Sequence, residues 1–447
     1  MPDGPYPQQA FQRELSRSFG TCRIHDHAVH GALCLAHVEE WSEGVFGSSE
    51  VWYLYPHQIG ITMPGILRDD YVAVEDQKEG SRLYGRGNYG YPRSGGGVDL
   101  DLIEALYLLE SRRLAVLGSD GSEISFAELF RHAARVVDGF DIKYAVFRDL
   151  RSRGLLCKFE SGGYDVSVFP VGCNMANSRP EYMVRAVSER NPIDLRDFLI
   201  GAKDTSERRK ALMYGVVDED GDMVYYTVSL EDPSGGVYPV PMKGRPSGFL
   251  VRDRVFVFDR SSWDQLRDYG YYGTSSAESL QLSLLEAAHL SGKGRLDVIG
   301  PDDSPLDFDD LMDIGSSMEK EFRTRFLVYS DLRSRGLVVK TGFKFGAHFR
   351  AYEASLDDAH ARYLVHAIQT DGMRVWSDVS RTVRLSVGVK KEILFGIPSK
   401  KGVDYLRFDW IRPGNVKPGT PSTPKKKRRA RRGGAPFRAV SRCRGAR

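Results

Sequence analysis

The chain contains a long internal duplication. The heptad DLRSRGL occurs at residues 149–155 and again at 331–337, an offset of 182. GILRDDYVAVED, which begins at Gly65, matches GFLVRDRVFVFD from Gly248, and Gly215 matches Gly396 at a nearly equal offset. Collinear matches over so long a stretch indicate two copies of a whole module, because the short repeats of solenoid proteins have periods of 20–50 residues.

The duplication divides the 447 residues into five parts. We expect an N-terminal extension over 1–62, a first repeat over 63–232, a Pro- and Gly-rich linker over 233–247, a second repeat over 246–413 and a tail over 414–447. The length and the 41% hydrophobic content allow two to four domains with real cores.

Each copy has the pattern of a mixed α and β module. Strands are predicted for YVAVED and VFVFD and for the later segments LVVK, HFRAY and RYLVHAI. LIEALYLLES and LQLSLLEAAHL carry apolar residues at helical spacing, and DLRSRG is typical of a helix C-terminus. GVVDEDGDMVYYTV predicts a hairpin that turns at Asp220-Gly221.

The near-neutral net charge of +3 conceals two oppositely charged regions. Residues 414–447 hold 12 Lys and Arg and no acidic residue, so subtracting 12 from +3 leaves −9 on the first 413 residues. No run of 18 apolar residues exists, and the N-terminus lacks the pattern of a signal peptide. Five scattered cysteines favour a reducing compartment over a disulfide framework.

The two copies differ at three chemically telling positions. Aligning GGYDVSVFPV with FGAHFRAYEA places Phe169 opposite Tyr352. Aligning EYMVRAV with RYLVHAI places Arg179 opposite His360, and the lysine at Lys391 has a counterpart in copy one. If the three residues of copy two form a site, one copy is active and the other is a scaffold.

A phenol, an imidazole and an ammonium suit phosphoryl transfer within RNA without a metal. Tyr352 could take a proton from a ribose 2′-OH, His360 could protonate the leaving 5′-oxygen, and Lys391 could neutralise the phosphate. A tyrosine phenol ordinarily titrates near pH 10, so such a base needs a neighbouring cation, which Lys391 or Arg350 could provide. The plainer alternatives are a packed strand tyrosine, a capping histidine and an exposed lysine at a strand end.

Copy two resembles the catalytic unit of archaeal tRNA-intron splicing endonucleases of the two-repeat, homodimeric type. The resemblance rests on GLVVKTGFKFGAHFRAY, HARYLVHAI and SRTVRLSVGVKKEILFGI, followed by YLRFDWIRP. Copy one resembles the same unit with a degraded site. We therefore expect an α+β fold of two tandem copies, each with a small N-terminal α/β subdomain and a mixed-sheet nuclease subdomain, and a disordered basic tail.

The resemblance implies an activity and its residues. The catalytic residues would be Tyr352, His360 and Lys391, the last in preference to Lys390. They would cut precursor tRNA at bulge-helix-bulge splice sites without a cofactor, leaving a 2′,3′-cyclic phosphate and a 5′-hydroxyl. Two arginines would clamp a bulge base: Arg384, and either Arg407 or Arg412.

The resemblance also implies an assembly. Four units, two of them active, would span the two bulges, so a chain of this kind would form a homodimer. The acidic loop Asp218, Asp220 and Asp222 would dock on a neighbouring subunit, whereas copy two has SKKGVD at the equivalent place. Without the resemblance, the loop would be interpreted as a solvated hairpin tip.

The two ends of the chain leave alternatives open. Cys22, His25, Cys34 and His37 have the short spacing of zinc ligands, although an added RNA-binding piece or a degenerate extension of the fold fits these residues better. The basic tail fits an arm for RNA phosphates, and PKKKRR also resembles a nuclear localisation signal. The fused two-copy organisation favours the RNA arm and the cytosol of an archaeon.

Two functions of different class follow from these observations. The first is an endoribonuclease that splices tRNA. The second is a non-catalytic RNA-binding or scaffold subunit of such a complex, with no membrane association in either case. The complete trio in copy two favours the enzyme, because a pure scaffold is expected to lose it as copy one did.

Overall fold

The computed structural model describes residues 64–414 apart from residues 161, 174, 176, 357–359, 370–373 and 389–390. Within this range the predicted α+β fold and its two tandem copies are confirmed. The N-terminal extension, its cysteines and histidines, Lys390 and the basic tail from residue 415 lie outside the described residues.

Copy one begins with a small subdomain and continues into a sheet with two helices. The small subdomain contains β1 (Gly65–Leu67), β2 (Tyr71–Val74), α1 (Gln77–Ser81), a π-helical turn (Arg82–Arg86), β3 (Tyr91–Pro92), β4 (Val98–Asp101), α2 (Leu102–Glu110), β5 (Val116–Leu117) and α3 (Phe126–Val136). The second subdomain contains α4 (Phe140–Ser152), β6 (Cys157–Phe159), β7 (Val166–Val168), β8 (Tyr182–Ser188), β9 (Pro192–Ile193), α5 (Leu195–Glu207), β10 (Ala211–Val217) and β11 (Met223–Glu231).

Copy two repeats this order of elements. Its small subdomain contains β12 (Ser247–Val251), β13 (Arg254–Val257), α6 (Arg260–Gly270), β14 (Thr274–Ser276), β15 (Ser279–Ser283), α7 (Leu284–Gly292), β16 (Asp297–Ile299), β17 (Pro305–Leu306) and α8 (Phe308–Met318). Its second subdomain contains α9 (Phe322–Ser334), β18 (Val338–Thr341), η2 (Phe343–Phe345), β19 (Phe349–Tyr352), β20 (Tyr363–Ala367), β21 (Arg374–Val375), α10 (Trp376–Gly388), β22 (Glu392–Ser399) and β23 (Gly402–Ile411). The long helices α4 and α9 begin and end at the same offset of 182 as the heptad.

One helix was predicted to start earlier in the chain than it does. LQLSLLEAAHL was expected to be helical throughout, but Leu280–Ser283 belong to strand β15. Helix α7 starts at Leu284 because the hydroxyl of Ser283 accepts a hydrogen bond from the backbone N–H of Glu286, whose carboxylate accepts one from the backbone N–H of Ser283. The apolar spacing of the first four residues was therefore that of a strand that buries Leu280 and Leu282.

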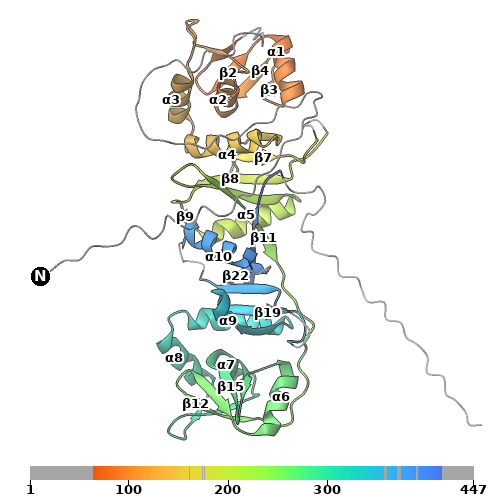
Figure 1. The fold of residues 1–447 in the computed structure, drawn as a ribbon, viewed down its shortest axis with the longest axis vertical. Coiled ribbons are helices and arrows are strands. Elements are labelled where there is room, and N and C mark those ends of the chain that lie inside the picture. The colour runs from red at the N-terminus through yellow and green to blue at the C-terminus, as the bar shows by residue number, and fades with distance from the viewer. Residues whose placement is uncertain are drawn as a thin grey trace, which may run out of the picture. The chain divides into compact units, whose positions relative to one another are not determined.

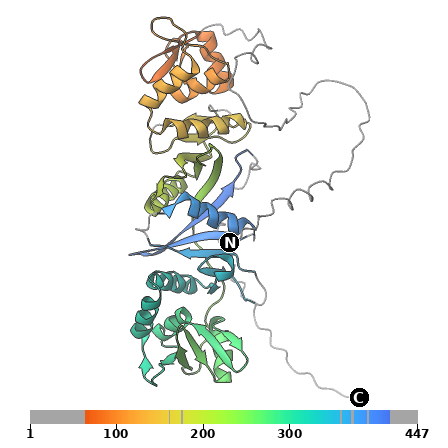
Figure 2. The ribbon, with the colours of Figure 1, turned by 60° about the vertical axis from the view of Figure 1, so that its left-hand side comes forward.

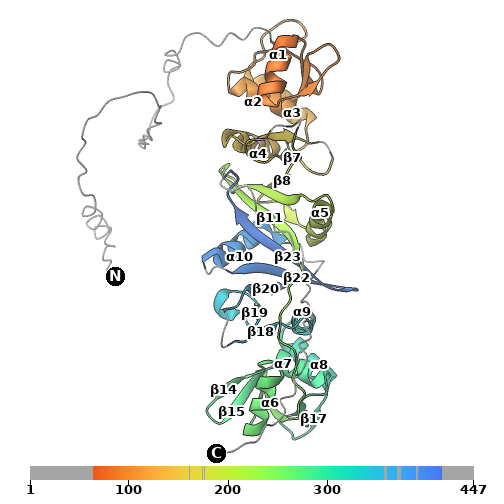
Figure 3. The same cartoon turned by 90° about the vertical axis from the view of Figure 1, so that its right-hand side faces the viewer.

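The second subdomains of both copies form a single ten-stranded sheet. The strand order is β18-β19-β20-β22-β23-β11-β10-β8-β7-β6, so β11 of copy one lies directly beside β23 of copy two (Figure 3). Each small subdomain has a separate sheet, β3-β4-β2-β1-β5 in copy one and β14-β15-β13-β12-β16-β17 in copy two.

The β11–β23 pairing relates the copies by a local two-fold axis. Tyr225 pairs with Ile411 and Glu231 pairs with Tyr405 in an antiparallel register that extends over seven residue pairs. Tyr225 and Tyr405 are themselves equivalent, since each phenol donates a 2.7 Å hydrogen bond to the aspartate of its own DLRSRGL heptad. The local two-fold axis therefore relates equivalent positions of the two copies, and the pairing joins both copies in one sheet.

Helices cover the shared sheet on both faces. Helices α4 and α9 pack on one face, while α5 and α10 pack on the other, where they share one core (Figure 1). In that core the ring of Phe198 lies 5.5 Å from Trp376 and 5.2 Å from Phe408, both of copy two. Burial of large aromatic rings from both copies makes the junction a core rather than a surface contact.

A buried ion pair joins the two subdomains of each copy. Lys158 of β6 donates to Glu104 of α2 at 2.6 Å and to the carbonyl of Gly90 at 3.1 Å. Copy two repeats the arrangement, with Lys340 2.8 Å from Glu286 and 2.9 Å from the carbonyl of Gly273. Because unpaired buried charges are costly, this clasp ties the position of the second subdomain to that of the first.

The linker of copy one runs along the end of copy two (Figure 2). The backbone N–H groups of residues 235–237 donate hydrogen bonds of 2.8–3.0 Å to the carbonyls of Arg335, Glu353 and Gly336. The side chain of Val237 then packs against Val338 and Tyr352. The segment after β11 therefore forms part of the wall around Tyr352.

The described helices include none that is both long and apolar enough to cross a bilayer.

The linker contact depends on the absence of a side chain at Gly235. A Cβ there would lie 2.2 Å from the carbonyl oxygen of Gly336, whereas a Cβ at Gly236 would approach only the carbonyl of Glu353, at 3.8 Å. We predict that Gly235→Ala detaches the linker and speeds amide exchange at Val237 about tenfold or more, while Gly236→Ala does not. Equal exchange in the two variants would contradict the contact, and hydrogen-exchange mass spectrometry measures it.

His289 of α7 is buried among aromatic rings. It lies 6.2 Å from the ring of Tyr272 and 5.6 Å from that of Tyr329. Burial, together with the charges of Arg333 and Lys293, lowers the pKa of His289 to about 4. The folded protein therefore holds this imidazole neutral, while the unfolded chain protonates it below pH 6.5.

Copy one has Tyr107 at the position equivalent to His289. Because the unfolded state binds the extra proton, stability from His289 is complete above pH 6.5 and falls as pH drops toward 4. We predict that His289→Tyr removes about 2 kcal/mol of the stability loss between pH 7.5 and pH 5. Urea unfolding at both pH values tests this, and an unchanged difference would refute it.

Candidate active site

Tyr352 is the last residue of β19 and is buried. It lies opposite Val338 of β18 and packs with Val338 and Ala361 in a small apolar cluster. The guanidinium of Arg350 lies 5.8 Å from the centre of the Tyr352 ring. A tyrosine base was expected to need a neighbouring cation, and Arg350 is a cation that lies beside this ring.

The predicted residues lie at the same end of three neighbouring strands of the shared sheet. Ala351 of β19 lies opposite Tyr363 of β20, which in turn lies beside Glu392 of β22. Tyr352 and Lys391 each stand one residue beyond these positions, on the same side. The N–H of Glu392 donates to the carbonyl of Arg362 at 3.0 Å and keeps the strand starts level.

The three candidate residues lie around Ala361. Tyr352 belongs with Ala361 to one small buried cluster, and the ammonium of Lys391 donates a 2.6 Å hydrogen bond to the Ala361 carbonyl. His360 precedes Ala361 in the chain and is exposed. The residues predicted from the comparison of the two copies therefore lie in one part of the molecule.

This arrangement combines one buried and one exposed proton-transfer group with a fixed cation. Lys391 also lies 5.8 Å from the ring centre of Phe345, a contact that sequence reasoning missed. GFKFG, which supplies Phe345, was visible as a segment with no aromatic counterpart in copy one. Across the described residues, His, Cys, Asp and Glu form no group of three or more that could hold a metal ion.

Copy one has the same backbone at the equivalent place but different chemistry. Cys157 pairs with Val168 as Val339 pairs with Ala351, so the next residue, Phe169, occupies the position of Tyr352. The strand register therefore agrees with the sequence alignment: Phe169 replaces Tyr352, and copy one lacks the hydroxyl at this position.

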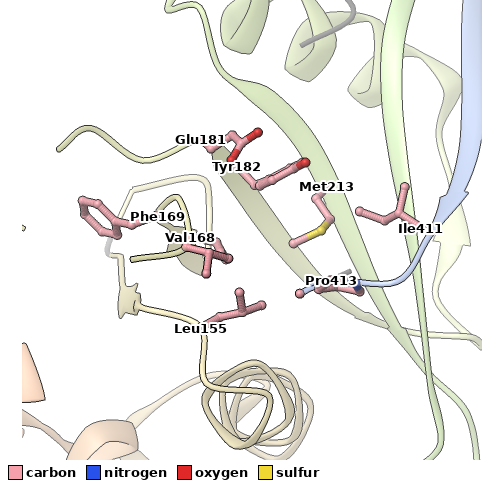
Figure 4. A pocket seen from close by; sticks show the side chains of 10 residues that line it. Leu155, Val168, Phe169, Glu181, Tyr182, Met213, Ile411 and Pro413 are labelled. Carbon is pink, nitrogen blue, oxygen red and sulfur yellow. The ribbon is translucent and has the colours of Figure 1, made fainter. Parts of the chain in front are cut away.

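The end of copy two covers part of the equivalent site of copy one. Leu155, Val168, Met213, Ile411 and Pro413 line a mainly apolar cavity of about 30 Å³ next to Phe169 (Figure 4). A cavity of that volume holds only one or two water molecules, so it has no room for a nucleotide.

Lys210, the counterpart of Lys391, also has a different environment. Its ammonium lies 3.7 Å from the sulfur of Met183. Arg179 takes the place of His360 and is exposed. Copy one thus keeps the lysine without the proton-transfer groups.

Arg384 of α10 is exposed and borders a different part of the molecule. It lines a groove of about 600 Å³ together with Arg381 and with Asp218 and Asp222 of the acidic hairpin. The groove therefore runs between the two copies and has basic and acidic sides. Residues that were assigned separate roles, in base binding and in subunit contact, border the same space.

Arg407 of β23 is half-buried and surrounded by carboxylates. Its guanidinium lies 3.1 Å from Glu392 and 2.9 Å from Asp409. Burial opposes the charge of Arg407, but Asp409, Glu392 and Glu231 outweigh it and raise its pKa. Arg412, the alternative, is exposed, and its guanidinium lies 5.0 Å from the centre of the Trp410 ring. Of the two, Arg412 is the more accessible to a base.

The acidic hairpin is held by its own first residue. The carboxylate of Asp218 accepts hydrogen bonds from the backbone N–H groups of Asp220 and Asp222, at 3.1 and 2.8 Å. Gly221 has the positive φ of 83° that the turn requires. Asp220 and Asp222 are exposed, so they can meet another surface while Asp218 maintains the turn.

Two family models match the chain, each of them twice. The model described as "tRNA intron endonuclease, N-terminal domain" matches residues 63–130 and 247–312. The model described as "tRNA intron endonuclease, catalytic C-terminal domain" matches residues 140–226 and 322–405. These stretches follow the two subdomains of each copy.

Curated relatives match most of the chain. A tRNA-splicing endonuclease of Methanococcoides burtonii is 35% identical over 342 residues, which cover 75% of this chain and 96% of the relative. The tRNA-splicing endonuclease of Haloferax volcanii is 30% identical over 374 residues, 78% of this chain and all of the relative. With both subdomains matched in both copies, the chain belongs to the archaeal tRNA-splicing endonucleases with two tandem N-terminal and catalytic repeats.

Proposed function

We propose that this tRNA intron endonuclease cuts precursor tRNA at the two splice sites of a bulge-helix-bulge, and that only copy two is catalytic. The observation that carries the proposal is the position of Tyr352 and Lys391 around Ala361, with His360 next to it in the chain. The narrow apolar pocket at the equivalent place in copy one supports the division into a catalytic and a structural copy.

In the proposed reaction, Tyr352 takes the proton of the ribose 2′-OH. The 2′-oxygen then attacks the adjacent phosphorus, and the bond from phosphorus to the 5′-oxygen breaks. His360 donates a proton to that leaving oxygen, and Lys391 stabilises the charge on the phosphate. The products are a 2′,3′-cyclic phosphate and a 5′-hydroxyl: one proton passes from the 2′-OH to Tyr352, and one passes from His360 to the 5′-oxygen.

Substrate binding in this proposal uses cations at two places. Arg384 stacks on a bulge base, since an exposed guanidinium can lie over an unpaired base. We keep Arg407 as the second clamp candidate with Arg412 as its alternative. Arg407 would first have to leave Glu392 and Asp409.

The chain is further proposed to act as a homodimer. One chain supplies one catalytic copy, whereas two splice sites require two. The exposed carboxylates of the acidic hairpin provide a charged contact that copy two lacks, because Lys400 and Lys401 stand in the equivalent turn. A scaffold subunit without activity is the alternative, and the cleavage assay distinguishes it.

The catalytic assignment predicts unequal effects of equivalent substitutions in the two copies. We expect the purified chain to cleave a bulge-helix-bulge RNA in EDTA and to leave a cyclic phosphate. His360→Ala should lower the rate constant at least 100-fold because the acid is lost. Arg179→Ala at the matching position of copy one is the control and should retain activity. Equal losses in both variants, or no cleavage by the intact chain, would refute the assignment.

The dimer predicts a second experiment. Asp218 is left intact because it maintains the turn, and Asp220 and Asp222 are both changed to Lys. Sedimentation of this variant is expected to show monomers. Cleavage is expected to fall about tenfold or more because the charge of the hairpin in the proposed contact is reversed. Lys400→Glu with Lys401→Glu is the control in copy two. A double variant that still sediments as a dimer would contradict the contact.

A further inference from the structure

Phe343 is a large apolar side chain that the fold leaves in solvent. It is 86% exposed and begins the short turn η2, which follows β18. An exposed aromatic ring contributes no burial to folding, so its presence in the catalytic copy needs another explanation.

The turn that carries Phe343 has a fixed backbone. Gly342 donates to the carbonyl of His348 at 3.0 Å and accepts from the N–H of Phe345 at 2.8 Å, and Gly346 donates to the carbonyl of Phe343 at 3.1 Å. Gly346 has a φ of 65°, the left-handed conformation that a glycine adopts without strain. Phe343 is therefore presented by a rigid element.

The turn is also seated beside the candidate active site. Phe345 packs on the core shared by the two copies, which includes Ala347. The ring centre of Phe345 also lies 5.8 Å from the ammonium of Lys391. Phe343 thus stands two residues from a side chain in contact with the candidate catalytic lysine.

The sequence of this turn has no match in copy one. Lys158 corresponds to Lys340 through the clasp, and Phe169 corresponds to Tyr352 through the strand register. Between these fixed points copy one is one residue shorter and has Glu160 to Gly163 where copy two has GFKFG. The copy without the phenol and the imidazole at the equivalent positions is also the copy without an aromatic residue at the position of Phe343.

We propose that Phe343 stacks on an unpaired nucleotide of the RNA next to the scissile phosphate, with the exposed Lys344 available to the phosphate backbone. The inference rests on the proposed function and adds a substrate-binding residue to it. Aromatic rings are the usual platform for unstacked bases, and a rigid exposed ring provides one at little entropic cost. A neighbouring exposed lysine favours RNA over an apolar protein partner.

The test measures stacking directly, in a chain that binds RNA without cutting it. Bulge-helix-bulge RNAs with 2-aminopurine at one bulge position each are titrated with the full-length His360→Ala chain. Adding Phe343→Ala is expected to weaken binding about 5- to 100-fold and to remove the fluorescence quenching at one bulge position. Phe343→Trp should restore both, whereas Phe343→Leu should restore neither.

Phe258 provides a matched control, since it is also an exposed phenylalanine of copy two, at 63%, and lies in the small subdomain. Phe258→Ala should bind RNA as the unchanged chain does. The proposal is overturned if Phe343→Ala behaves like Phe258→Ala, if Phe343→Leu binds as well as Phe343→Trp, or if Phe343→Ala sediments as a monomer. The last result would assign the ring to contact with a second copy of the chain.

The same RNAs separate this inference from the proposed function. In the chain with His360 intact, Phe343→Ala should raise KM 5- to 100-fold and leave kcat nearly unchanged, because stacking contributes to binding. An intact chain that binds the RNA without cutting it would defeat the proposed function while the quenching remains measurable. A chain that cuts with no change in quenching on Phe343→Ala would defeat this inference alone.

Discussion

The antiparallel pairing of β11 with β23 is the interaction on which the arrangement of this protein depends. It converts two half-sheets into one sheet of ten strands and relates equivalent residues by a local two-fold axis. The rings of Phe198, Trp376 and Phe408 fill the face beneath it. Because neither half-sheet has to leave this edge open, the pairing also removes a strand edge that would otherwise be free to aggregate.

The same junction makes the two copies unequal. Ile411 and Pro413, at the end of β23, line the pocket beside Phe169 in copy one. The segment that follows β11 instead packs Val237 against the cluster that contains Tyr352. One site is reduced to an apolar cavity, and the other retains a phenol, an exposed imidazole and a bound ammonium. In the proposed function, the duplication therefore provides one copy for structure and one for chemistry without a change of fold.

What both copies retained is what the fold needs. The Lys–Glu clasp occurs in both, as does an arginine stacked on a tyrosine, with Arg151 4.1 Å from the Tyr89 ring centre and Arg333 equally close to Tyr272. Burial makes each of these contacts costly to break. His360 and Phe343 are exposed, and Phe169 in copy one keeps the aromatic ring of Tyr352 without its hydroxyl, so copy one could lose these groups and still fold.

The sequence by itself determined the duplication, the class of the fold and the identity of the catalytic candidates, because repeats and the differences between them are preserved in residue order. Residue order also located the hairpin at Asp220-Gly221. It did not indicate that LQLS is a strand, since alternating and helical spacing coincide over four residues. Nor did it show that Lys158 and Glu104 meet, that Asp218 maintains its own turn, or that Arg407 is held by carboxylates. Those are contacts between segments far apart in the chain or between neighbours in a specific turn, and only the tertiary structure decided them, because register and packing determine which side chains share a space.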